Sequence, residues 1–288
     1  MRALIIALLL LAPQTGAAYR ADVEAFRKQR ETEINGPTGW AALVGLHWLT
    51  AGTFTIGRTP GSQIALAGPS APATLGKISV TDHDATIALA PGVAGTVKNA
   101  PVTSVTLQPN SDIDTALVVG KTSMIVIRRG QRLALRVWDS AAPNRTKYAH
   151  LTWMAIDPKW RFSATFIPHA NPPKMKIQNV LGETIEMTNP GAVEFVTGGK
   201  TIRLEALLES DDAKEFFFMF KDATSNKTTY GAGRYLYTPL PKDGHVDLDF
   251  NKADNPPCAF TDFATCPLPP LPNRLTIAVP AGETYAKH

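Results

Sequence analysis

Polar side chains suited to binding or proton transfer gather near the C-terminus of the 288-residue chain. Asp249 and Asn251 flank one aromatic residue at the end of a predicted strand, so both side chains point to the same face. Asn255 precedes two prolines, which hold its backbone extended, and prolines lower the entropy cost of keeping a site in shape. We expect a rigid pocket for a small anionic or sugar-like molecule, with these candidate ligand-binding residues: Arg136, Asp139, Arg145, Tyr230, Arg234, Asp249, Asn251, Asn255, Asn273, Arg274 and Glu283.

Two other interpretations of the same residues stay open. A proline-rich loop lacks backbone donors, so buried Asn and Asp side chains are needed to satisfy the peptide groups around them. An ion pair of Asp249 with Arg234 or Arg274 would then only stabilise the fold. Alternatively, Asp249 and Glu283 are the carboxylate pair of a hydrolase, which requires both to face one cleft about 5–10 Å apart.

Arg136, Asp139 and Arg145 form a second cluster, at the end of a predicted strand. The planar fork of an arginine side chain suits a carboxylate or a phosphate. An internal salt-bridge network is the competing interpretation of this cluster.

Several classes of site lack their sequence signatures. The six histidines form no H-x-H or H-x-x-x-H pair, so we predict neither a metal site nor a cofactor. The chain has no G-x-S-x-G nucleophile elbow, no dinucleotide-binding G-x-G-x-x-G and no P-loop. Its formal charge of +4 comes from scattered residues, which gives no indication of nucleic-acid binding.

The two cysteines, Cys258 and Cys266, are separated by seven residues. In an oxidising compartment, two cysteines at this spacing most often pair, and the short loop lets their Cα atoms approach bridging distance. We therefore expect a disulfide, with two reduced buried thiols as the alternative.

The hydrophobic patterns predict a mainly β protein with two packed sandwich-like or barrel-like units and one amphipathic helix. The helix is expected at Asp22–Ile34, and short apolar runs with turn residues every 8–12 positions follow it. Arg132–Trp138 alternates, with one face expected to be buried and the other to carry arginine. Phe216–Phe220 is apolar on both faces and predicts a covered central strand. Arg274–Val279 is expected to be the last strand.

We place the unit boundary within 139–159, a segment rich in turn formers. The predicted division is 19–145 for the helix and first β-unit and 146–288 for the second, with one continuous domain as the alternative.

The first 18 residues have the layout of a secretory signal peptide: Arg2, an apolar run over 3–12, and small residues before a cut ahead of Tyr19. No later stretch is long and apolar enough to span a membrane. We expect a periplasmic or secreted protein.

Over nearly the whole length from Tyr19 onwards, the chain resembles the DUF1684 family. The motifs that carry the resemblance are Asp249-Phe250-Asn251, Asn255-Pro256-Pro257-Cys258-Ala259-Phe260, Cys266-Pro267-Leu268-Pro269-Pro270, Asn273-Arg274-Leu275, Ala281-Gly282-Glu283 and, upstream, Arg136, Asp139, Arg145, Trp160, Tyr230 and Gly233-Arg234. The resemblance implies no activity and no catalytic residue, because that family's function is unknown.

Residues 52–66 also resemble the opening of a forkhead-associated domain, a β-sandwich that binds phosphothreonine. That family has a Ser-x-x-His turn where this chain has Ser70-Ala71-Pro72-Ala73-Thr74, so the resemblance implies the architecture and not phosphopeptide binding. Because no nucleophile–base or metal pair is found, we expect an exported small-molecule or envelope-associated binding module, with the carboxylate hydrolase as the alternative.

Overall fold

The computed structural model describes residues 16–285. The signal peptide predicted at 1–18 falls mostly outside the described residues, so export stays a prediction. Within residues 16–285, no helix is long and apolar enough to cross a membrane.

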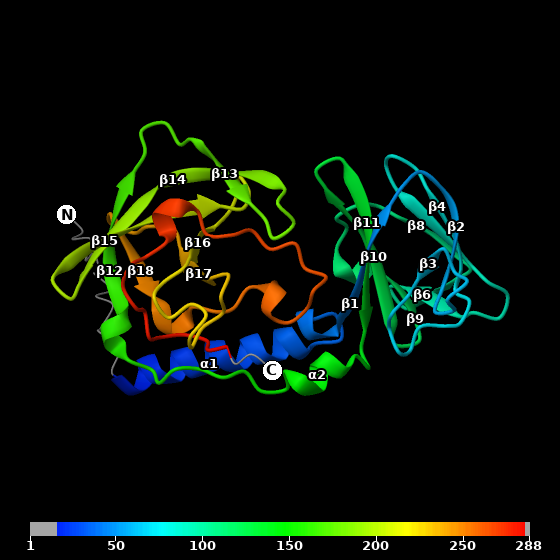
Figure 1. The fold of residues 1–288 in the computed structure, drawn as a ribbon, viewed down its shortest axis with the longest axis horizontal. Helices are drawn as coiled ribbons and strands as arrows, with labels where there is room; N and C mark the ends of the chain where they lie inside the picture. The colour runs from blue at the N-terminus through cyan, green and yellow to red at the C-terminus, as the bar shows by residue number, and fades with distance from the viewer. Residues whose placement is uncertain (1–15, 286–288) are drawn as a thin grey trace, which may run out of the picture.

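The first β-unit is a sandwich of two sheets, seen on the right of Figure 1. One sheet has the order β1-β11-β10-β9-β6-β7, and the other has the order β3-β2-β4-β5-β8. The bounds are β1 Leu43–Leu49, β2 Gly52–Gly57, β3 Ile64–Ala65, β4 Gly76–Val80, β5 Ala85–Leu89, β6 Gly95–Val97, β7 Ala100–Val102, β8 Ser104–Leu107, β9 Leu117–Val119, β10 Thr122–Arg129 and β11 Arg132–Asp139.

Alternation along the strands builds the core of the sandwich. Leu133, Leu135 and Val137 of β11 point inward and pack with Ile78 and Ile87 of the opposite sheet. A two-residue period of this kind sends every second side chain to one face, so the sequence pattern is sufficient to place these residues in the core.

The second β-unit is a nearly closed barrel with the strand order β17-β16-β15-β14-β12-β18, in which β17 and β18 lie side by side. β13 pairs with the long strand β14 and forms an arm of the sheet. The bounds are β12 Arg161–Pro168, β13 Lys174–Gln178, β14 Thr184–Thr197, β15 Lys200–Leu208, β16 Glu215–Phe220, β17 Arg234–Pro239 and β18 His245–Asp249.

β16 is covered on both faces, as its sequence predicts. Phe216, Phe218 and Phe220 fill the barrel interior, while Phe217 and Met219 pack on the outer face. All five side chains are buried. The mainly β fold with two units and an N-terminal amphipathic helix is therefore confirmed.

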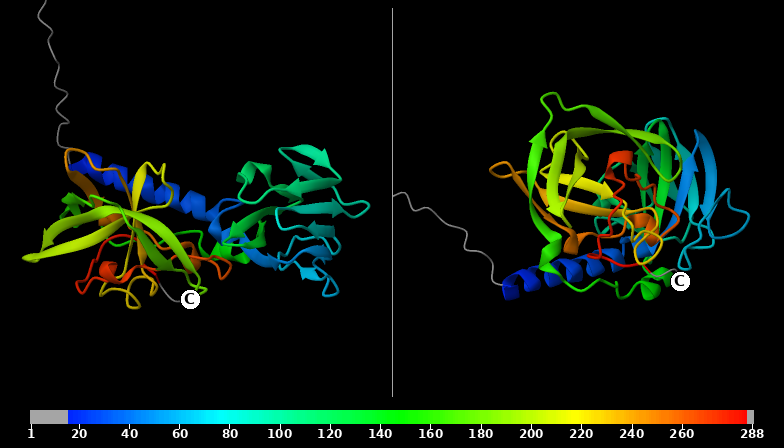
Figure 2. Two further views of the ribbon diagram at one scale, coloured as in Figure 1. Left: turned by 90° about the horizontal axis from the view of Figure 1, so that it is seen from above. Right: turned by 60° about the vertical axis from the view of Figure 1, so that its left-hand side comes forward.

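The helix α1, Gly16–Asn35, lies along the barrel and runs on towards β1 of the sandwich (Figures 1 and 2). Tyr19, Val23 and Ile34 form its buried stripe. The 3-10 helix η1, Trp40–Ala42, joins it to β1, and a second short α-helix, α2 at Pro143–Lys147, follows the sandwich. In space, α1 thus packs on the second unit although it precedes the first in sequence.

Three details of the sequence analysis need correction. Arg274–Val279 is not a strand, because it makes only isolated hydrogen bonds to the chain just after β16. Leu275 N–H donates to Lys221 O, and Val279 N–H donates to the Asp222 carboxylate. The sequence pattern favours only a short strand at Glu194–Val196, whereas β14 begins at Thr184, because the Asn189-Pro190-Gly191 stretch is a β-bulge inside one long strand. Gly191 has φ +154°, and a Cβ atom there would clash with Ile167 O.

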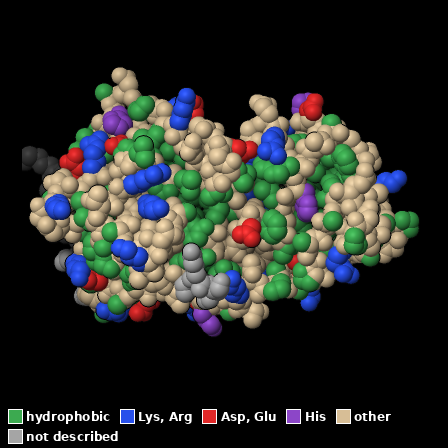
Figure 3. Space-filling model, viewed as in Figure 1, with side chains coloured by type: hydrophobic (Ala, Val, Ile, Leu, Met, Phe, Trp, Pro, Cys, Tyr) green, Lys and Arg blue, Asp and Glu red, His purple; other side chains and the backbone are tan. Residues whose placement is uncertain are grey.

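The third correction concerns the outer face of β11. Ala134, Arg136 and Trp138 are buried and not exposed, because Trp40 of η1 and Phe263 of the second unit pack on this face. Figure 3 shows hydrophobic side chains gathered where the two units meet.

Candidate functional site

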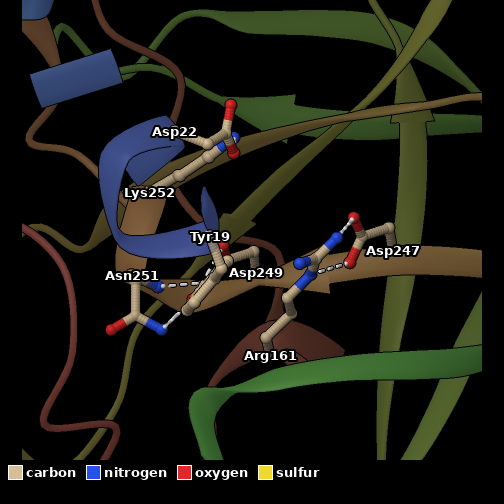
Figure 4. Close-up of polar contacts among 7 residues, drawn as sticks. All are labelled: Tyr19, Asp22, Arg161, Asp247, Asp249, Asn251 and Lys252. Carbon is tan, nitrogen blue, oxygen red and sulfur yellow. Dashed lines mark hydrogen bonds and ion pairs between the residues drawn. The ribbon is translucent and has the colours of Figure 1, made fainter. Parts of the chain in front are cut away.

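Asp249 and Asn251 lie close together, and both side chains are hydrogen-bonded to Tyr19 near the N-terminal end of α1. The Tyr19 hydroxyl donates to the Asp249 carboxylate at 3.0 and 3.1 Å and accepts from Asn251 Nδ2 at 2.9 Å (Figure 4). Asn251 Oδ1 also accepts from Asp157 N at 2.9 Å. Burial and the adjacent Asp249 carboxylate raise the pKa of Tyr19, so its hydroxyl remains a donor.

Arg234 is the most deeply buried of the candidate arginines, at 1% exposure. Its Nη2 donates to Asp222 Oδ2 and to Val279 O, both at 2.9 Å, and its Nη1 donates to Ala281 O. The guanidinium is thus used to hold the last segment of the chain against the barrel.

Asn273 has a similar role between two strands of the barrel. Its side chain accepts from Glu205 N at 2.7 Å and donates to Glu205 O and Met219 O at 3.0 Å. Its neighbour Arg274 is exposed. The two residues therefore do not share a pocket.

Asn255 and Glu283 line one cavity of about 120 Å³ beside α2. The Asn255 N–H donates to Glu283 Oε2 at 3.0 Å, while Asn255 Oδ1 has no partner within the described residues. Desolvation raises the pKa of Glu283 to about 8. Asp249 is not part of this cavity wall, so the two carboxylates of the hydrolase alternative do not meet there.

Asp139 and Arg145 bind backbone groups and not each other. Asp139 accepts from Ser70 N at 2.6 Å and Ala141 N at 2.8 Å. Arg145 Nε donates to Asn35 O at 2.8 Å. Arg136 points to the opposite face of β11 from Asp139, because the two are three residues apart on a strand.

Both cysteines are free thiols in the structure. They are neighbours all the same: the Cys258 N–H donates to Cys266 Sγ at 3.1 Å. Tyr230 donates from its hydroxyl to Cys258 O at 3.1 Å, and its ring packs edge-on against Tyr285 beside a separate cavity of about 400 Å³. The disulfide stays a prediction.

Arg136 is the buried candidate residue whose charge has no ion-pair partner among the described residues. It lines a cavity of about 280 Å³ between the sandwich and the barrel, which we call the inter-unit pocket. The residue is 9% exposed, its Nε has no hydrogen-bond partner, and no acidic group within residues 16–285 lies within ion-pair distance of it. Its guanidinium instead lies over the Trp40 ring, 5.2 Å from the centroid.

Desolvation, with repulsion from Arg129, lowers the pKa of Arg136 to about 10. Arg129 lines the same pocket and is held by a 3.4 Å contact from its Nε to Thr265 Oγ1. At neutral pH, the sandwich therefore presents two cations to the pocket, and among the described residues neither is ion-paired with the acidic residues of the wall, Glu209 and Asp254.

Aromatic rings on the outer face of the barrel form the opposite wall. Phe217 and Tyr237 stack with centroids 4.7 Å apart and planes at 13°, and Tyr235 meets Phe217 edge-on at 4.8 Å. All three line the inter-unit pocket. Register explains this, because Phe217 pairs with Tyr237 across β16 and β17.

One ion pair closes the pocket on the side of α1. Arg30 Nε lies 3.2 Å from Asp254 Oδ2, and Arg30 also donates to Asn255 O at 2.8 Å. Burial raises the pKa of Asp254 to about 6 in spite of Arg30. This arginine is thus neutralised, whereas Arg129 and Arg136 are not.

Five residues of the inter-unit pocket could not be identified as site residues from the sequence: Trp40, Arg129, Phe217, Tyr235 and Tyr237. They were missed because they come from distant elements that meet only when the units pack. The available signal was the arginine-bearing face of the alternating 132–138 strand. If that face packs against the second unit, its arginine is removed from water and needs a new partner.

No group of three or more His, Cys, Asp or Glu side chains within residues 16–285 is arranged to hold a metal ion.

A family model described as "Protein of unknown function (DUF1684)" matches residues 146–284, a range that contains every strand of the barrel. The solution structure of an uncharacterised protein from Haloarcula marismortui is similar, with 31% sequence identity, coverage of 49% of this chain and 80% of that chain, and a TM-score of 0.42. No curated protein matches this chain. Through residues 146–284, the chain belongs to the DUF1684 family.

Proposed function

We propose that this protein is an exported binding module that takes a small anionic molecule in the inter-unit pocket. The single observation that carries the proposal is Arg136, a buried guanidinium that faces a cavity without an acidic partner. A buried charge without a partner is costly, by several kcal/mol in general. A bound carboxylate or phosphate would supply the missing charge and accept its N–H groups.

The other candidate arginines do not have this property. Arg234 is paired with Asp222, and Arg145 is bound to backbone carbonyls. Arg274 is exposed, where water solvates its charge. Export is supported by the N-terminal sequence pattern alone. No observation within the described residues favours the hydrolase alternative.

The test is a calorimetric titration and a thermal-shift measurement with sodium benzoate, sodium phosphate and sodium galacturonate, against sodium chloride at equal ionic strength. We expect at least one of the three anions to bind the wild-type protein and raise its Tm. In Arg136→Met, the affinity for that anion should fall at least about tenfold, because a charge-assisted contact is lost.

Arg274→Met is the matched control, since it removes an exposed arginine of the same type. It should bind the anion as the wild type does. Absence of binding for all three anions, or an equal loss in both variants, would contradict the proposal.

A further inference from the structure

One wall of the inter-unit pocket is cationic and the opposite wall is aromatic, and this arrangement indicates which class of anion fits. The sandwich side presents Arg129 and Arg136, and the barrel side presents the rings of Phe217, Tyr235 and Tyr237. We propose that the ligand is an aryl carboxylate, with its carboxylate at the arginines and its ring against the aromatic wall. This inference rests on the proposed function and specifies its ligand class.

The hydrogen-bonding groups around the pocket argue against a sugar acid. Tyr235 donates its hydroxyl to Pro267 O at 2.7 Å, and Thr265 Oγ1 is in contact with Arg129 Nε. Asp254 is paired with Arg30, and the Glu209 carboxylate of the same wall interacts with the Tyr237 hydroxyl. Because these groups already have partners, a ligand rich in hydroxyl groups would find few left, whereas an aromatic ring needs none.

Aromatic geometry supports a flat ligand. Tyr237 is 38% exposed, while its stacked partner Phe217 is 2% exposed. Phe217 is thus fixed in the barrel wall, and Tyr237 is the ring of the stacked pair that a ligand can reach. A further ring placed edge-on or offset against it would gain the usual energy of an aromatic pair.

The arginine side selects for a planar, forked acceptor. Arg136 is already positioned between Trp40 at 5.2 Å and Trp138 at 5.9 Å from its guanidinium carbon. These two contacts hold the guanidinium beside the indole rings, while its Nε has no hydrogen-bond partner within residues 16–285. A carboxylate offers the two parallel acceptors that such an edge binds.

The experiment compares benzoate with cyclohexanecarboxylate, which has the same charge and similar size but no π-system, by calorimetric titration of the full-length protein. Benzoate should bind about three- to tenfold more tightly, as expected for one aromatic pair. Tyr237→Leu should remove this preference, and Tyr237→Phe should keep it because the ring remains.

Tyr285→Leu is the control for location, because Tyr285 lines the separate cavity beside Tyr230. It should leave the benzoate preference unchanged. Equal affinity for the two carboxylates, or loss of the preference in Tyr285→Leu, would overturn the aryl inference. If phosphate or galacturonate instead binds in an Arg136-dependent way, the proposed function stands and only this ligand class is wrong. If no anion binds, the proposed function itself fails.

Discussion

At the scale of single residues, buried charge is the property that separates a binding group from a structural one in this protein. Asp139, Arg234 and Asn273 are all buried, and each has a full set of protein partners. Arg136 is buried to a similar degree and lacks them. Its side chain therefore carries a desolvation cost that the unliganded protein does not recover.

Arg136→Met is expected to stabilise the unliganded protein. The methionine retains the apolar contact with Trp40 and removes a buried unpaired charge, so the free energy of unfolding should rise by about 1–2 kcal/mol. Urea denaturation at pH 7 measures this change. Arg234→Met should do the opposite and lower stability by about 3 kcal/mol, since Asp222 would be left buried without its partner.

Glu283 gives the stability of the protein a pH dependence with a definite sign. Desolvation raises its pKa from an ordinary 4.5 to about 8, so the folded state binds the proton more tightly than the unfolded state. The stabilisation is complete below about pH 4.5 and is lost as the pH rises through about 8. We expect the Tm to fall over this window, and Glu283→Gln to flatten the fall. A wild-type profile unchanged by this substitution would contradict the assignment.

At the scale of secondary-structure elements, the Asn273 side chain replaces backbone hydrogen bonds between β15 and β16, where these two strands diverge. β15 and β16 share the single register pair Leu207–Phe217. Beside that gap, the Asn273 amide bonds Glu205 on one strand and Met219 on the other. The 3-10 helix Leu271–Asn273 thus completes the barrel wall that the ladder leaves open.

Asn273→Ala is expected to destabilise the protein by about 3 kcal/mol, because three buried backbone groups lose their partner. Asn273→Asp should be no better, since a carboxylate cannot donate to Glu205 O and Met219 O. Chemical denaturation measures both variants, with Asn171→Ala as the control on an exposed asparagine. Comparable losses in the control would contradict this role.

Strands with a regular hydrophobic pattern could be predicted from the sequence, whereas segments with an irregular pattern could not. The alternation in β11 and the two-faced apolar run of β16 place their core residues correctly. The start of β14 and the chain after Arg274 were not predicted correctly, because the bulge at Pro190-Gly191 interrupts the strand pattern in the first and the apolar residues of the second do not form a strand. Among the residues of the inter-unit pocket, only Arg136 could be predicted from the sequence. The aromatic residues around it depend on how the two units pack.

At the scale of the whole molecule, the inter-unit pocket joins the two β-units, and α1 spans both. Arg30 of α1 contacts Asp254 at the pocket, and η1 carries Trp40 from the end of this helix into the same wall. A ligand held there would contact the sandwich and the barrel together.

Saturating benzoate is therefore expected to slow amide hydrogen exchange in both units at once. Protection should appear in β10 and β11 around Arg129 and Arg136 and in β17 around Tyr235, because binding opposes local opening on either side. Mass spectrometry of peptides from the full-length protein measures this. Protection confined to one unit would contradict a ligand bridging the two, and Arg136→Met should remove it.

The position of Trp40 has a spectroscopic consequence. Trp40 is one of five tryptophans, all within residues 16–285, and it lines the inter-unit pocket, where Arg136 lies over its ring. A cation beside an indole shifts its emission, and an anion that neutralises this cation reverses the effect. Occupancy of the pocket should thus be readable as a change in intrinsic fluorescence, without any added label, and Trp40→Phe would reduce that signal to the contribution of Trp138, the second indole beside Arg136.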